Sequence, residues 1–147
     1  MLQPANISNR LALALSILRY TIFITMAMWT MDKFVRPEHA AAIFEHFYGL
    51  AGLGINLVYA LATAEAILLI AFLIGLKPRF TYGAVLILHG VSTLASYQQY
   101  INPFDANNLL FFAAWPMLGA SFTLYILRDF DIWRIATCCG FCKNKTE

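Results

Sequence analysis

The chain has 147 residues, of which 61% are hydrophobic and only 12% are charged. Soluble domains carry roughly 25% charged residues, so this composition argues against a soluble fold. The net charge is only +2, and no basic stripe with interleaved aromatic residues is present, which sets nucleic-acid binding aside. Because a bilayer span takes roughly 20 apolar residues, the length suits four spans with short loops and tails. We expect one membrane domain over residues 1–147.

The first apolar stretch covers residues 11–31 and contains a single charge, Arg19. It is too long, and too charged in its middle, for a signal peptide, so we expect it to stay in the mature protein. Charged residues then mark the exit from the membrane, and Pro37 suits the first turn of a new helix at 37–48. Apolar residues of this segment recur at helical spacing opposite polar ones, which predicts a short helix lying in the headgroup region.

Three further apolar stretches follow at 56–76, 80–97 and 108–127. A basic turn at 77–79 separates the first two, and Pro116 is expected to kink the last one. The remaining residues, 128–147, form a tail. The sequence therefore predicts an all-α fold: an integral membrane four-helix bundle with one interfacial helix between the first and second spans.

Positive charges predict the orientation of this bundle. Four spans place both termini and the 77–79 turn on one side of the membrane. Outside the spans, that side has seven Lys and Arg residues and the opposite side has two. By the positive-inside rule the termini are cytoplasmic, in an inner or plasma type of membrane. The basic residues on the terminal side are Arg10, Lys77, Arg79, Arg128, Arg134, Lys143 and Lys145, and those on the opposite side are Lys33 and Arg36.

Ionisable residues within three predicted spans fall at a similar depth. With a rise of about 1.5 Å per residue, Arg19, Glu65 and His89 lie about 12, 16 and 13 Å from the cytoplasmic ends of their spans. An unpaired charge at such a depth costs about 3 kcal/mol or more, so we expect these residues to form a buried polar cluster. The arrangement of lowest free energy is an ion pair between Arg19 and Glu65, with a neutral His89 beside it.

This cluster has two interpretations. The first is structural, since polar pairs fix the register of helices in membrane bundles, and a lone His on an apolar face is most often a satisfied core residue. The second is functional, because intramembrane charges commonly mark sites for a headgroup, a quinone ring or a proton. His89 distinguishes the two interpretations, because ion pairing alone accounts for Arg19 and Glu65.

The same residues carry a resemblance to a known family. Arg19 lies near the start of an apolar run that closes on Lys33 followed by Phe34, and Glu65 precedes a second apolar run, a small Gly75 and a basic turn. Over residues 18–131 this arrangement resembles the DoxX-like family of small membrane proteins. Arg19, Lys33 and Glu65 match family positions, and His89 lies outside the pattern.

The resemblance implies a four-helix membrane bundle. It also implies links to sulfur or thiol redox chemistry, to quinone reduction, or to assembly with soluble redox enzymes. A quinone is therefore the cofactor to consider, although the residues alone establish none.

The tail contains Cys138, Cys139 and Cys142, which include a Cys-x-x-Cys spacing. This spacing suits a redox dithiol, whereas a zinc site would need a fourth ligand from a second copy. Reduced thiols near a cytoplasmic membrane surface, or lipidated thiols, are the alternatives. His39 and His46 share a helix face with Glu38 and Glu45, but polar groups on an interfacial helix ordinarily meet water and phosphate, and we expect no metal site there.

Three functions follow for testing. The first is an accessory or anchoring subunit of a redox-linked membrane complex. It is favoured because the chain has no P-loop, dinucleotide fingerprint or hydrolase elbow, which argues against a self-contained enzyme. The second is a quinone- or thiol-linked oxidoreductase that uses Arg19, Glu65 and His89. The third is a small-molecule or lipid-headgroup carrier, acting as an oligomer. The expected partners are membrane lipids and either other subunits of a complex or further copies of the chain.

Overall fold

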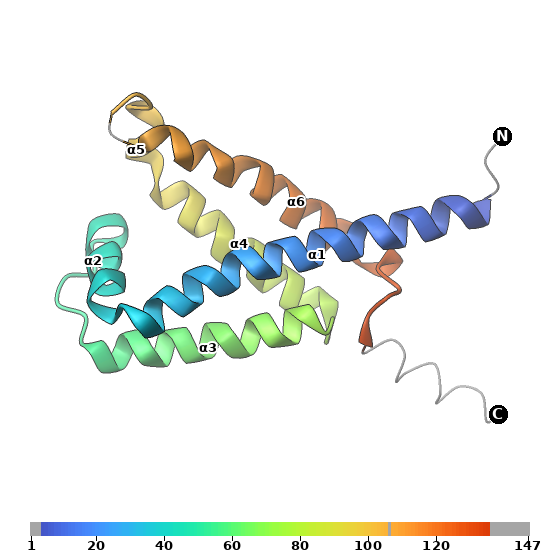
Figure 1. The fold of residues 1–147 in the computed structure, drawn as a ribbon, viewed down its shortest axis with the longest axis horizontal. Helices are drawn as coiled ribbons and strands as arrows, with labels where there is room; N and C mark the ends of the chain where they lie inside the picture. The colour runs from blue at the N-terminus through green and yellow to red at the C-terminus, as the bar shows by residue number, and fades with distance from the viewer. Residues whose placement is uncertain (1–3, 106, 136–147) are drawn as a thin grey trace.

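The computed structural model describes residues 4–105 and 107–135, and this part of the chain contains helices and no strand. Both ends of the described chain lie at one end of the molecule, the terminal end, and α2 and α5 lie at the other, the α2 end (Figure 1). The elements in chain order are α1 (Pro4–Val35), α2 (Pro37–Tyr48), α3 (Ile55–Leu73), α4 (Pro78–Ala95), α5 (Tyr97–Ile101), the 3-10 helix η1 (Asn108–Ala113), α6 (Ala114–Ile126) and the 3-10 helix η2 (Arg128–Phe130).

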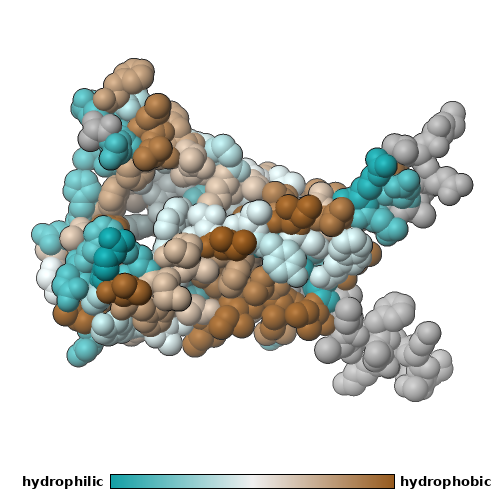
Figure 2. All heavy atoms as spheres, in the orientation of Figure 1, coloured by the Kyte–Doolittle hydropathy of each residue, from teal (hydrophilic) through white to brown (hydrophobic). Residues whose placement is uncertain are grey.

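Helix α1 runs the length of the molecule and packs against both α3 and α6, while α4 packs against α6 and α3 (Figure 1). The buried residues of α1 recur every three or four positions, which places them on one face of a helix with 3.6 residues per turn. These residues are Ala12, Leu15, Ser16, Arg19, Ile22, Met26 and Thr30. Large apolar side chains are exposed over much of the surface, and polar residues gather at the α2 end and at the start of α1 (Figure 2).

The apolar core lies toward the terminal end. It joins α1 to α3, α4 and α6 through side chains that are at most 3% exposed. The ring of Phe72 on α3 meets that of Tyr82 on α4 edge-on, with centroids 5.0 Å apart, a geometry that aromatic pairs favour. The core members are Leu15, Ile22, Met26, Leu69, Phe72, Tyr82, Val85 and Leu124.

Three helical stretches of the described residues are long and apolar enough to cross a membrane: Asn6–Val35, Ile55–Leu73 and Asn108–Ile126. The predicted span at 80–97 corresponds to α4, which is not among these three. The buried face of α4 includes Thr81, His89 and Thr93. These three polar side chains therefore point toward neighbouring helices, whereas the charged Arg79 in the first turn of α4 is exposed.

The helix ends differ in detail from the predicted ranges. Helix α1 begins at Pro4 and ends at Val35, whereas the first span was expected at 11–31. The expected short helix is α2, and Gly49 ends it with a left-handed φ of 67° and an N–H that donates to the Glu45 carbonyl. In the predicted span at 108–127, Pro116 was expected to kink one long helix. The structure instead has the 3-10 helix η1 followed by α6, with the change of geometry at Ala114, just before Pro116.

Candidate functional site

A cavity of about 1090 Å³ lies between α1, α2, α3, α4 and the η1–α6 stretch. The surface is hollowed between α2 and α5, at the α2 end (Figure 2). This volume slightly exceeds the range of roughly 300–1,000 Å³ that is typical of small-molecule sites, which are mostly apolar with a few polar groups. The apolar lining comes from Met26, Trp29, Phe44, Phe47, Leu68 and Met117. The cavity therefore suits a ligand that is largely apolar.

An ion pair lies in the wall of this cavity. The Nζ atom of Lys33, near the end of α1, contacts the Oε2 atom of Glu65 on α3. The two side chains are 20% and 15% exposed, and both line the cavity. A ligand can therefore reach this pair, in contrast to a fully enclosed structural ion pair.

The expected pair between Arg19 and Glu65 does not form, since Arg19 bonds to Asp131. The cause is the register of α1 against α3. Their packing places Lys33 beside Glu65, and Arg19 lies about 21 Å along α1 from Lys33 at the usual helical rise. The predicted cluster therefore divides: Glu65 and His89 line the cavity, whereas Arg19 belongs to a second polar site.

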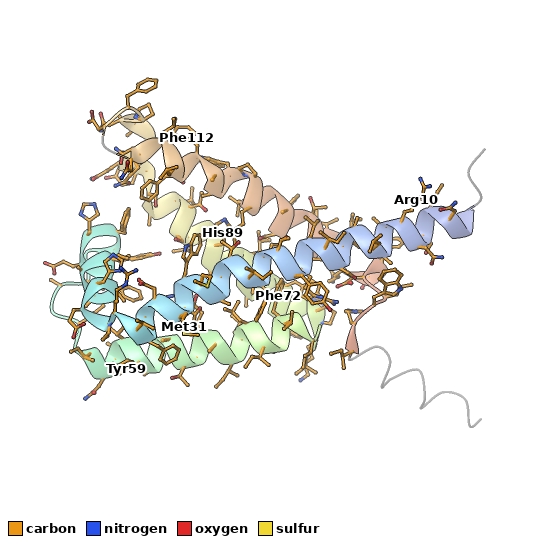
Figure 3. The ribbon with its side chains drawn as sticks, in the orientation of Figure 1. Arg10, Met31, Tyr59, Phe72, His89 and Phe112 are labelled. Carbon is orange, nitrogen blue, oxygen red and sulfur yellow. The ribbon has the colours of Figure 1, made fainter. Side chains whose placement is uncertain are left out.

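His89 is 1% exposed and lies on the side of α4 that faces α1 (Figure 3). Its Nε2 atom lies 3.1 Å from the carbonyl oxygen of Ala114 at the start of α6. Its ring stacks on the indole of Trp29, with centroids 5.9 Å apart and planes at 27°. Its Nδ1 atom has no hydrogen-bond partner among the described residues. This unsatisfied atom lies at a residue that lines the cavity.

Charged residues also line the cavity where α1 meets α2. The Oδ1 atom of Asp32 accepts a hydrogen bond of 2.6 Å from Arg36 Nε, and Oδ2 lies 2.7 Å from His39 Nδ1. His46, by contrast, packs edge-on against Phe47. Within residues 4–105 and 107–135, no group of three or more His, Cys, Asp or Glu side chains is placed to hold a metal ion.

The second polar site lies in the core and holds the segment after α6 against α1 and α4. Arg19 Nη1 donates to Asp131 Oδ2 at 2.9 Å and to the Tyr82 hydroxyl at 3.2 Å, and Nη2 donates to the Trp133 carbonyl at 2.8 Å. Tyr82 donates in turn to Asp131 Oδ2 at 2.6 Å. Arg19, Tyr82 and Asp131 are at most 1% exposed. We call these three residues the Arg19 network; it closes the terminal end.

Sequence reasoning missed Tyr82 and Asp131. A usable signal was present in the sequence: a buried Arg19 requires an acidic partner, and Asp131 is flanked by the apolar residues Phe130 and Ile132. The candidate thiols Cys138, Cys139 and Cys142 lie outside the described residues, so the proposed dithiol stays a prediction.

Comparisons of the chain with protein-family models, with curated proteins and with solved structures found no match.

Proposed function

We propose that this protein is an integral membrane protein that binds a small amphipathic molecule of the quinone class in the cavity at the α2 end. The observation that carries the proposal is an apolar cavity of about 1090 Å³ whose wall contains the partly buried Lys33–Glu65 pair and the buried His89. A flat ring with oxygen substituents would stack on Trp29, and its apolar tail would lie along the methionine and phenylalanine side chains.

Helix α4 belongs to the membrane-embedded bundle that we propose. We propose that α1, α3, α4 and α6 together form the membrane-embedded bundle, because α4 packs between α3 and α6 with its polar face buried. In such a bundle, polar side chains that point inward avoid contact with lipid. The accessory-subunit role implied by the DoxX-like resemblance is compatible with a bound quinone, which would accept electrons from or donate them to a redox partner.

Charge supports cytoplasmic termini. Basic residues gather at the terminal end, and acidic residues gather at the α2 end. Of the described basic residues outside the Arg19 network, five lie at the terminal end and two at the α2 end: Arg10, Lys77, Arg79, Arg128 and Arg134, against Lys33 and Arg36. Of the described acidic residues, five lie toward the α2 end and two at the terminal end: Asp32, Glu38, Glu45, Glu65 and Asp105, against Asp129 and Asp131. By the positive-inside rule, the cavity would open on the side opposite the cytoplasm.

Binding of a benzoquinone with a decyl tail to the detergent-solubilised protein tests the proposal by equilibrium dialysis. We expect saturable binding that Leu88→Trp weakens by about tenfold or more, because Leu88 lines the cavity and the larger side chain would occupy part of the space that the ligand needs. The matched control is Leu94→Trp on the same helix, which replaces a leucine that is 64% exposed and does not line the cavity. Absence of saturable binding, or equal effects of the two variants, would contradict the proposal.

A further inference from the structure

The hydrogen bond to Ala114 fixes the tautomer of His89. A carbonyl oxygen can only accept, so the proton of the contact between His89 and Ala114 is on Nε2. A charged imidazolium in this apolar site would need an acidic partner, and no ion pair of His89 is formed within the part of the chain that the structure describes. The ring is therefore neutral, and its Nδ1 atom carries a lone pair that can only accept a hydrogen bond.

A second acceptor lies one helical turn further along the cavity. Lys33 follows Trp29 by four residues on α1, which corresponds to roughly 6 Å along the helix axis. Glu65 pairs with Lys33 through Oε2 only, so its carboxylate has further capacity to accept. The Lys33 ammonium also keeps N–H donors, so this pair can bond to either form of a quinone and the discrimination between the forms falls to His89. Glu65 and His89 both line the cavity, and each can accept a hydrogen bond from a ligand hydroxyl.

We infer that the cavity prefers the reduced, hydroxyl-bearing form of a quinone to the oxidised form. This inference rests on the proposed function and concerns binding alone. A hydroquinone carries two O–H donors, which match Nδ1 of His89 and the carboxylate of Glu65. A quinone has only carbonyl acceptors, and one placed against the lone pair of Nδ1 leaves that atom without a partner. Nδ1 is buried, with Trp29 stacked on the imidazole, so binding of the ring hydroxyl requires the indole, which is 45% exposed, to move aside.

The test compares the two forms of one ligand. Equilibrium dialysis under nitrogen measures the affinity of the detergent-solubilised protein for a decyl-substituted benzoquinone and for its hydroquinone. We expect the hydroquinone to bind about five- to tenfold more tightly, which is the factor that one added hydrogen bond supplies. If the quinone binds as tightly as the hydroquinone or more tightly, the inference is wrong while the proposed function stands. If neither form binds, both fail.

The decisive variant is His89→Gln. The terminal amide of glutamine can replace Nε2–H as the donor to Ala114, but it offers nothing at the position of Nδ1. We expect the preference for the hydroquinone to disappear while the affinity for the quinone is unchanged. His89→Asn, whose amide oxygen can occupy the position of Nδ1, should restore part of the preference. If His89→Gln weakens both forms equally, His89 has only a structural role and the inference is overturned.

Discussion

Each charge of the Arg19 network is stabilised by the groups around it. The guanidinium of Arg19 bonds to the carboxylate of Asp131 and the hydroxyl of Tyr82, both buried, and to the partly buried carbonyl of Trp133. In such surroundings, the net contribution of an ion pair to the free energy of folding differs greatly from the destabilisation caused by removing one of its partners. The pair itself contributes little relative to apolar residues of the same volume, but a single unpaired buried charge is strongly destabilising.

Asp131→Asn should therefore lower the free energy of unfolding by about 3 kcal/mol, because it leaves the Arg19 charge without its counter-ion. Unfolding of the detergent-solubilised protein, followed by circular dichroism, measures the change. The double variant Arg19→Met with Asp131→Leu removes both charges and should be less destabilised than Asp131→Asn. If Asp131→Asn unfolds as the wild type does, the carboxylate does not stabilise Arg19.

At the residue scale, the expected burial holds for Arg19 and His89 but not fully for Glu65, whose side chain is 15% exposed, and the expected partner of Arg19 was wrong. The burial of Arg19 and His89 follows from their positions within long apolar runs, and both are 1% exposed. The partner of Arg19 depends on tertiary packing, because Asp131 lies 112 residues away in a segment that returns to the bundle. The partner of Glu65, Lys33, follows only once the register of α1 against α3 is known.

At the scale of elements, the turn between α3 and α4 is where the C-terminal segment docks. Gly75 adopts a left-handed φ of 71°, and a Cβ atom built there would lie 2.6 Å from the side chain of Arg134. The absence of a side chain at position 75 thus makes room for the aliphatic part of Arg134. The turn and the Arg19 network therefore hold the same segment from two sides.

Gly75→Ala should destabilise the protein more than Gly49→Ala does. Both glycines have a left-handed φ, which costs an alanine about 1 kcal/mol, but nothing lies within 4 Å of a Cβ at Gly49. Only the Gly75 variant must also displace Arg134. The two free energies of unfolding, measured by denaturant titration in detergent, should differ by at least about 1 kcal/mol. Equal values would mean that Arg134 moves aside without cost.

The positions of the helices were predictable because hydrophobic runs and turn residues are local signals. The range 37–48 matches α2, and a basic turn does separate α3 from α4. The true length of α1 was not visible, because residues 4–10 are polar and continue the helix without an apolar pattern. The cavity was not predictable either, since it arises where helices from five parts of the chain diverge.

At the scale of the whole molecule, the orientation decides which side of the membrane supplies the ligand. The cavity lies at the α2 end and the basic residues lie mostly at the terminal end, so the proposed topology places the cavity opposite the cytoplasm. A ligand would then enter from that side or from the adjoining leaflet, whereas the segment held by the Arg19 network would face the cytoplasm.

Cysteine labelling tests this topology in spheroplasts of a bacterial host. In a background with Cys138, Cys139 and Cys142 replaced by serine, Phe104→Cys places a thiol in the loop before η1, at a residue that is 90% exposed. Ser8→Cys places one on the exposed start of α1. A membrane-impermeant maleimide should label Phe104→Cys in intact spheroplasts and label Ser8→Cys only after lysis, since the basic terminal end is retained inside. The reverse pattern would place the cavity on the cytoplasmic side, and labelling of both sites in intact spheroplasts would contradict the membrane-embedded bundle itself.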